Sequence, residues 1–233
     1  MEVWPLTNLK TNSEPRKFKS RPSAVRQARP APAAGELLLA DLLAEPFLAV
    51  EIGCGVGLHA IQYASEFPDR SMIAIERTND KFASFARRLG KHPHLKNRLC
   101  AVHADAFQYL DENFPRRSID EVWIMYPNPE PKKAARRWFF APFTGRLIEL
   151  LKPGAKLFLS TNIDSYARDC VRMAGDFQLV VERSDAFSRL TRPDWKPRTH
   201  FEKKYLLRGE TCHNLMFRKA SDVACHIRSA RVE

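Results

Sequence analysis

Short hydrophobic runs alternate with stretches of helical periodicity along the middle of the chain. The apolar runs, which predict buried strands, span residues 46–52, 71–76, 98–104, 119–126 and 155–161. The periodic stretches, which predict helices, span residues 58–67, 80–89, 105 to about 113, 136–151 and 164–174. Pro142 is expected to kink or restart the fourth helix, and two further apolar runs, 178–182 and 212–218, could close a sheet. This alternation predicts a doubly wound α/β domain whose mostly parallel sheet is covered on both faces.

The two ends of the chain differ in composition from the middle. Residues 1–33 hold seven lysines and arginines and five prolines. They have too little apolar surface to offset the entropy lost on ordering. We therefore expect a flexible basic arm over residues 1–33, one domain over 34–220 and a loosely ordered tail over 221–233. A solvated linker and an arm that contacts phosphates both fit the composition of the arm.

Composition excludes several classes of protein. The chain has 233 residues, 44% of them hydrophobic and 28% charged, which is the balance of an ordinary soluble domain. It has no run of about 18 apolar residues that would predict a membrane span, and its opening Met1–Pro5 lacks the pattern of a secretory signal. The five cysteines are scattered without a Cys-x-x-Cys pair, which argues against a disulfide framework and a zinc site. We expect a cytoplasmic monomer with reduced thiols, no metal and no membrane contact.

Charge adds a candidate partner. The 38 lysines and arginines exceed the 27 acids by 11, and the sequence pI is about 9.6. Such a surplus favours a polyanion such as nucleic acid, although it also serves solubility. Eight of the basic residues lie between 183 and 208, interleaved with Trp195, Phe201 and Tyr205. Lysine and arginine neutralise phosphates and aromatic rings stack on bases, but Trp195 and Phe201 could equally be core residues.

A glycine-rich turn follows the first predicted strand. It contains Gly53, Gly55 and Gly57, which allow a tight turn and close approach of a ligand. The spacing differs from the Gly-x-Gly-x-x-Gly of dinucleotide binders, and Glu51 suits a cationic ligand rather than a pyrophosphate. S-adenosylmethionine, with its amino group and sulfonium, is such a ligand. A tight turn without a ligand is the alternative.

Acidic residues also end the next two predicted strands. Glu76 ends the second strand, where a carboxylate can accept both ribose hydroxyls of a cofactor. Asp105, followed by Ala106, ends the third and would lie near an adenine amino group. Either acid alone could be a helix N-cap. Together with the glycines, the acids favour S-adenosylmethionine over a nicotinamide cofactor.

Two segments narrow the class further. One reads Tyr126-Pro-Asn-Pro-Glu-Pro-Lys-Lys133, and the other reads Pro197-Arg-Thr-His-Phe-Glu-Lys-Lys-Tyr205. This pair resembles the bacterial tRNA (guanine-N(7)-)-methyltransferase family, which carries an aromatic-Pro-Asp-Pro-Trp-Pro-Lys-Lys loop and a later Thr-x-aromatic-Glu segment. The resemblance covers about residues 36–218. It implies a Rossmann-like class I fold and methyl transfer from S-adenosylmethionine to guanine nitrogen-7 in the variable loop of tRNA.

The resemblance also implies roles for individual residues. The cofactor-binding positions are Glu51, Gly53, Gly55, Gly57, Glu76, Asp105 and Ala106. The substrate-binding positions are Lys132, Asn162, Thr199, His200, Phe201 and Glu202. Asn128 stands where the family has a proposed catalytic aspartate, and Asn162 where it has a substrate-contacting aspartate. Glu130 replaces the tryptophan of the loop.

These departures bear on the chemistry. Guanine nitrogen-7 has a free lone pair, so the enzyme must mainly align it with the methyl group. Positive charge then develops on the purine, and a nearby carboxylate stabilises it. We therefore expect Asn128 to orient the base and Glu130 to supply the charge, both as catalytic residues. Asn128 could instead hold the proline-flanked turn. The protein could also methylate another base, another RNA or a small molecule, or bind RNA without turnover.

Overall fold

Residues 39–127, 139 and 143–221 are described by the computed structural model. The strands are β1 (Leu48–Ile52), β2 (Ser71–Glu76), β3 (Leu99–His103), β4 (Ile119–Met125), β5 (Leu151–Thr161), β6 (Leu179–Phe187) and β7 (Cys212–Lys219). The helices are α1 (Leu39–Ala44), α2 (Leu58–Glu66), α3 (Asn79–Leu89), α4 (Ala106–Asn113), α5 (Phe143–Leu150), α6 (Asp164–Met173) and α7 (His200–Leu207). Two short 3₁₀ helices span Pro93–Leu95 and Ala174–Phe177.

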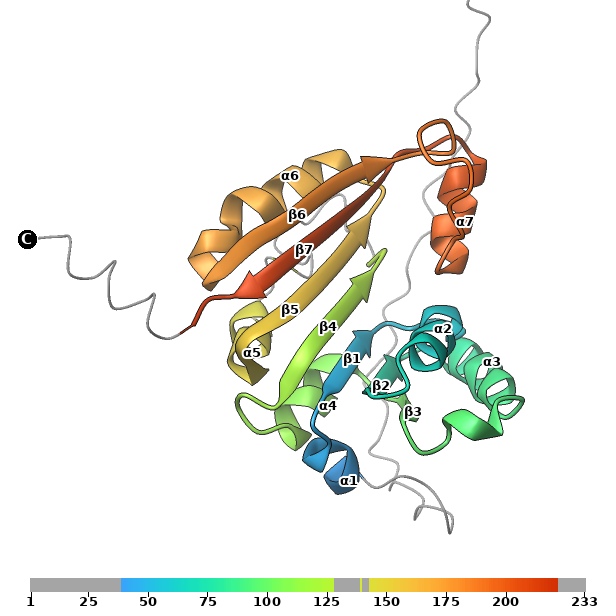
Figure 1. Ribbon diagram of the computed structural model, residues 1–233, viewed down its shortest axis with the longest axis vertical. Coiled ribbons are helices and arrows are strands. Elements are labelled where there is room, and N and C mark those ends of the chain that lie inside the picture. The colour runs from blue at the N-terminus through green and yellow to red at the C-terminus, as the bar shows by residue number, and fades with distance from the viewer. Residues whose placement is uncertain (1–38, 128–138, 140–142, 222–233) are drawn as a thin grey trace, which may run out of the picture. The chain divides into compact units, whose positions relative to one another are not determined.

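The strands form one seven-stranded sheet in the order β3-β2-β1-β4-β5-β7-β6 (Figure 1). β1 to β5 are parallel, and β7 runs antiparallel to its neighbours β5 and β6. This arrangement confirms the predicted doubly wound, mostly parallel sheet. The strand order changes direction between β1 and β4, so a ligand crevice is expected beyond the carboxyl ends of these two strands.

Alternate residues of the central strands point to two apolar cores on opposite faces of the sheet. On β1, Val50 packs in a core with residues of α1, α4, α5 and α6. Its neighbour Ala49 packs in a second core with residues of α2 and α3. β1 and β2 are buried along their whole lengths. Their mostly apolar sequences are typical of strands covered on both faces.

A third apolar cluster anchors α7, a helix that the sequence pattern did not predict. The cluster consists of Met125, Tyr126, Phe187, Leu206 and Cys212, with Trp195 and Tyr205 packed against it. Figure 1 shows α7 beyond the arrowhead ends of β4 and β5. Trp195 thus takes part in packing, which was one of the two roles left open for it.

Two predicted boundaries were wrong, and a third lies partly outside the described residues. β5 begins at Leu151 and not after the Lys-Pro-Gly turn, because the turn lies inside the strand where its register on β4 shifts. β6 continues to Phe187, well beyond the predicted end at 182, because it pairs with β7 along its length. The helix predicted over 136–151 is described only from Phe143, directly after Pro142. The predicted arm, and the predicted tail beyond residue 221, lie outside the described residues.

The described residues also bear on membrane and metal binding. None of their helices is both long enough and apolar enough to cross a membrane. Within the same residues, no group of three or more His, Cys, Asp or Glu side chains could hold a metal ion. None of the four described cysteines, Cys54, Cys100, Cys170 and Cys212, is in a disulfide.

Candidate functional site

The turn after β1 has an unusual backbone at all three glycines. Gly53, Gly55 and Gly57 have φ values of +75°, +61° and +74°. Residues with a Cβ rarely adopt such values. A Cβ added at Gly57 would lie 1.9 Å from the Phe85 ring of α3, so packing requires glycine there. A Cβ added at Gly53 or Gly55 would meet no atom of the described part of the chain within 4 Å. The first two glycines therefore border open space that a ligand can enter.

Glu76 ties this turn to the start of α3. Its carboxylate is buried at the end of β2, where Oε2 accepts a hydrogen bond from Gly55 N (2.9 Å). Oε1 accepts one from Thr78 N (2.7 Å). Each oxygen keeps a lone pair. The side chain is thereby held rigidly with acceptors left for a polyhydroxyl ligand.

Glu51 is buried without such partners. Only 1% of the residue is exposed, and its Oε2 lies 3.2 Å from His59 Nδ1 on α2. This contact lacks hydrogen-bond geometry, so both atoms remain without a hydrogen-bond partner among the described residues. A buried carboxylate oxygen without a donor is costly, and a cationic amino group would satisfy it. Nothing in the sequence pattern pointed to His59 as its neighbour.

Cys54 lies in the same turn and is chemically inert there. Burial raises the pKa of the Cys54 thiol well above its usual value, and the nearby charges of Glu51 and Glu76 raise it further. The thiol therefore stays protonated at neutral pH. A protonated thiol is a weak nucleophile, which disfavours a chemical role for Cys54.

Asp105 and Ala106 lie where β3 leads into α4. Asp105 is the N-cap of α4, and its Oδ1 accepts hydrogen bonds from Phe107 N (3.0 Å) and Gln108 N (3.4 Å). Its Oδ2 lies 3.7 Å from Arg77 Nη1. The capping role that was weighed for this acid is therefore present. Both hydrogen bonds use Oδ1, so the lone pairs left for a ligand are on Oδ2, the oxygen nearest Arg77.

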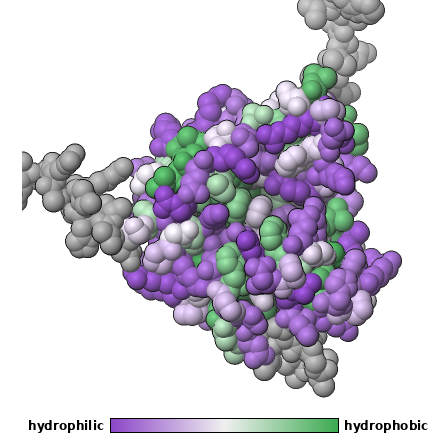
Figure 2. All heavy atoms as spheres, viewed as in Figure 1, coloured by the Kyte–Doolittle hydropathy of each residue, from purple (hydrophilic) through white to green (hydrophobic). Residues whose placement is uncertain are grey.

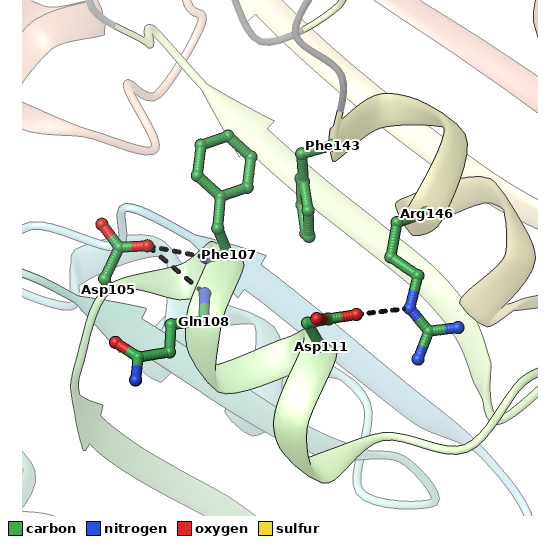
Figure 3. Close-up of a pocket in the computed structure, with 6 residues that line it drawn as sticks. All are labelled: Asp105, Phe107, Gln108, Asp111, Phe143 and Arg146. Atoms are coloured by element: carbon green, nitrogen blue, oxygen red, sulfur yellow. Dashed lines mark hydrogen bonds and ion pairs between the residues drawn. The ribbon is translucent and has the colours of Figure 1, made fainter.

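An open groove of about 500 Å³ adjoins Asp105 between α4 and α5 (Figure 3). Its lining residues are Asp105, Phe107, Gln108, Asp111, Phe143 and Arg146. The rings of Phe107 and Phe143 meet edge to face with centroids 4.1 Å apart. Arg146 donates to Asp111 at the far end of the groove (2.7 Å). The groove thus has an apolar end next to Asp105 and an ion pair at the other.

The substrate-side residues are only partly described. Asn128, Glu130 and Lys132 lie outside the described residues. Asn162 directly follows β5, and its Nδ2 donates a hydrogen bond to Glu210 Oε2 (2.8 Å). The position that holds an aspartate in the resembled family therefore has a carboxylate beside it.

The structure divides the tetrapeptide 199–202 into inward and outward residues. Thr199 is the N-cap of α7, and its Oγ1 accepts from Glu202 N (3.0 Å). Glu202 is completely buried, whereas His200 and Phe201 are exposed. Lys81 Nζ of α3 lies 5.4 Å from the centre of the Phe201 ring. This cation–π contact brings the first turns of α3 and α7 together.

Sequence reasoning missed the partners of Glu202. Its carboxylate accepts hydrogen bonds from Tyr126, Trp195 and Arg198. Arg198 also donates to Ser160 near the end of β5 and to Asn214 near the start of β7. One available signal was the Thr-x-x-Glu spacing, which marks a helix N-terminus. It would have indicated α7, although not the strands that contact it.

The sheet order with an antiparallel β7, and a glycine turn beside buried acids, define a Rossmann-like class I methyltransferase. Solved structures share this fold. The 16S rRNA methyltransferase KamB has a TM-score of 0.59 at 12% identity, over 78% of this chain and 92% of that chain. A mutant 16S rRNA (adenine(1408)-N(1))-methyltransferase from Catenulisporales acidiphilia, solved with cosubstrate SAM, has a TM-score of 0.57 at 15% identity, over 78% and 90%.

Sequence relatives specify the family. Residues 45–215 match the model of a family described as "Putative methyltransferase". The tRNA (guanine-N(7)-)-methyltransferase of Nitrosomonas eutropha is 30% identical over 174 residues, 74% of this chain and 76% of that protein. That of Paracoccus denitrificans is 33% identical over 74% and 72%, and that of Ralstonia pickettii is 29% identical over 72% and 65%. The chain belongs to the tRNA (guanine-N(7)-)-methyltransferase family. Its predicted family and enzyme class are confirmed.

Proposed function

We propose that this protein transfers a methyl group from S-adenosylmethionine to nitrogen-7 of a guanine in the variable loop of tRNA. The observation that carries the proposal is the open space at Gly53 and Gly55, bordered by the buried carboxylates of Glu51 and Glu76. Relatives named for this reaction support the choice of substrate. In this proposal the enzyme acts in the cytoplasm as a monomer.

S-adenosylmethionine is the methyl donor, as the methyltransferase family and the named cosubstrate of a structural neighbour support. When bound, it supplies an activated methyl group. The Oε2 atom of Glu51, which has no hydrogen-bond donor among the described residues, fits the amino group of this cofactor. The remaining lone pairs of Glu76 fit the ribose hydroxyls. Asp105 and Ala106 are proposed to border the adenine, beside the apolar end of the groove.

The residues of the chain contribute positioning and charge to the reaction. Guanine nitrogen-7 attacks through a free lone pair, so no side chain has to remove a proton first. Asn128 is proposed to hold the base in line and Glu130 to stabilise the positive charge that develops on it. Lys132 is proposed to contact the RNA. These three roles rest on the family motif, since all three residues lie outside the described part of the chain.

The described surface supports an RNA partner next to the crevice. Phe201 is 40% exposed in the first turn of α7, with Tyr205 stacked behind it. Exposed basic residues of this helix and of the turn after β2 are Arg77, Lys203, Lys204 and Arg208. In Figure 2 hydrophilic residues cover most of the face in view. A basic surface with an exposed aromatic ring suits phosphates and an unstacked base.

Asn128 and Asn162 keep a second candidate open, a methyltransferase of the same fold with another target base. The contact between Asn162 and Glu210 argues partly against it, because a carboxylate remains at that end of β5. A third outcome is RNA binding without turnover. The two alternatives differ from the main proposal in their product, which makes them testable together.

The deciding experiment incubates the purified protein with S-adenosylmethionine and unmodified tRNA transcripts. The nucleosides are then analysed by mass spectrometry. We expect 7-methylguanosine, and mapping of the modified position should place it in the variable loop. A different methylated nucleoside would favour the second candidate. Cofactor and RNA binding by calorimetry with no methylated product would favour the third.

A further inference from the structure

Tyr126 directly follows β4 and has a strained backbone conformation. Its φ of +52° lies in the left-handed region, where a bulky side chain is an outlier. The residue is nevertheless buried, and its N–H donates to Ser160 O of β5 (2.8 Å). The next residue is Pro127, and the chain then continues into the segment that carries Asn128. Strain of this kind persists only where the surroundings impose it.

A hydrogen bond of the Tyr126 side chain helps to hold this strained backbone in place. Its hydroxyl donates a hydrogen bond to Glu202 Oε1 (2.8 Å), 76 residues further along the chain. Burial and the charge of Glu202 hold the pKa of the Tyr126 hydroxyl far above its usual value, so it keeps the proton that it donates. The end of β4 is therefore tied to the first turn of α7.

Glu202 is in turn fixed by Arg198. Arg198 N donates to Glu202 Oε2 (2.7 Å), and Arg198 Nη2 donates to Glu202 Oε1 (2.6 Å). Burial alone would raise the pKa of the Glu202 carboxyl, but the hydrogen bonds and charge of Arg198 outweigh it and lower the pKa. The carboxylate stays charged. With no exposed surface, it offers nothing to a substrate.

Arg198 extends these contacts to the sheet. Its Nη2 lies 2.6 Å from Asn214 Oδ1 on β7 and 3.2 Å from Ser160 Oγ on β5. Ser160 Oγ also donates to Asn214 Oδ1 (2.7 Å). The Tyr126–Glu202–Arg198 network thus joins α7 to the carboxyl ends of β4 and β5 and to the start of β7.

We infer that Tyr126 and Glu202 are positioning residues that set the direction in which the chain leaves β4 toward Asn128. Glu202 acts through its hydrogen bond to Tyr126 and does not contact the substrate. Within residues 199–202, the exposed residues His200 and Phe201 contact the substrate. This inference rests on the proposed function, because Asn128 has a catalytic role only there. It reassigns Glu202, which the family motif presents as a substrate-binding residue.

A pair of matched variants tests this inference in the full-length protein. Tyr126→Phe removes only the hydroxyl that contacts Glu202. Tyr63→Phe removes a hydroxyl that donates to another buried carboxylate, Glu121 (2.7 Å), in the amino-terminal half of β4. Both variants should lower the melting temperature by similar amounts. Tyr126→Phe should lower kcat for tRNA methylation by about tenfold with cofactor Kd within about twofold, whereas Tyr63→Phe should leave kcat within about twofold.

A second measurement does not depend on activity. Hydrogen exchange should accelerate at the end of β4 and in the first turn of α7 in Tyr126→Phe and Glu202→Gln. In Tyr63→Phe it should accelerate in α2 instead. An equal loss of kcat in both tyrosine variants, or no change in Tyr126→Phe, would overturn the inference. If the wild-type protein methylates no tRNA, the proposed function fails, and unchanged exchange at β4 and α7 would separately reject the positioning role.

Discussion

The three acids of the crevice differ in burial and in what they contact, although each follows or ends a predicted strand in the sequence. Glu76 accepts two backbone hydrogen bonds, whereas Glu51 has an oxygen with no donor among the described residues. Asp105 caps a helix and is 40% exposed at its side chain. Their order along the chain predicted a shared edge of the sheet. The N-cap role of Asp105 was one of the roles that the sequence allowed, whereas the partners of Glu51 and Glu76 depend on the folded turn.

Glu76→Ala should weaken binding of S-adenosylmethionine by about 1–3 kcal/mol, because it removes the proposed ribose acceptor. Isothermal titration calorimetry measures this. Glu182→Ala is a suitable control, since it removes an exposed carboxylate of β6 that pairs with Arg218. The control should leave cofactor affinity unchanged. Unchanged affinity in Glu76→Ala as well would remove Glu76 from the cofactor site.

Glu130→Gln should lower the rate of methyl transfer by about tenfold or more and spare cofactor affinity, because it removes the charge that opposes the developing cation. Asn128→Asp should preserve or raise activity on tRNA, since it restores the aspartate of the family motif. Single-turnover kinetics with the methylated product quantified would measure both. Full activity of Glu130→Gln, or loss of methylation in Asn128→Asp, would contradict these roles and favour another target base.

At the scale of elements, the local hydrophobic pattern predicted most strands of the sheet. It missed the elements whose formation depends on contacts with distant parts of the chain. Five strands were predicted because buried parallel strands are continuous apolar runs. β6 was predicted too short because its exposed residues between 182 and 186 look like loop, and only pairing with β7 makes them strand. α7 was missed because it buries few residues, Glu202 among them. Its place depends on contacts with distant strands.

The turn after β1 allows an element-scale prediction. Gly57→Ala should lower the free energy of unfolding by about 2–4 kcal/mol, because it adds strain at positive φ and a clash with Phe85. Gly53→Ala should cost about 1–2 kcal/mol, from the backbone alone. Urea denaturation compares the two variants. Phe85→Leu in the Gly57→Ala background should recover part of the loss, and equal losses in both alanine variants would count against a packing role for Gly57.

At the scale of the whole molecule, the charge surplus is spread over segments with different surroundings. Some basic residues are used internally, as Arg198 is by Glu202 and Arg70 by Glu121. Others, such as Lys203 and Lys204, are exposed next to the crevice. The net charge of +11 predicted a polyanionic partner. The structure distinguishes the cations that stabilise the fold from those that remain available to RNA.

Binding of tRNA should weaken steeply with salt, with the slope of log affinity against log salt reporting the number of phosphate contacts. Replacing the seven lysines and arginines of residues 1–33 by glutamine in the full-length chain should flatten this slope. Deleting residues 1–33 should flatten it equally, which separates charge from length. Binding measured between 50 and about 200 mM salt tests this. Identical slopes for all three proteins would show that the arm contacts no phosphates.

The protein should lose stability as pH falls. Burial lowers the pKa of His213, with Arg168 adding to the shift and Asp164 opposing it. The unfolded chain therefore takes up this proton first, and the free energy of unfolding falls below about pH 6.5. The lowered pKa of Glu202 adds a further loss below about pH 4.5. Urea denaturation from pH 8 to 4 should show a shallower decline in His213→Gln between pH 6.5 and 5, and a flat profile would contradict the assignment.

The sequence by itself determined the alternating sheet, the glycine turn and the acids at its edge, because periodicity and turn chemistry are local properties of the chain. It also determined the family, through two short motifs. Only the tertiary structure decided which acids have partners, that Glu202 faces the core and Phe201 the solvent, and that α7 is tied to β4 through Tyr126. These features depend on side chains up to 76 residues apart. Their contacts exist only once the sheet has assembled.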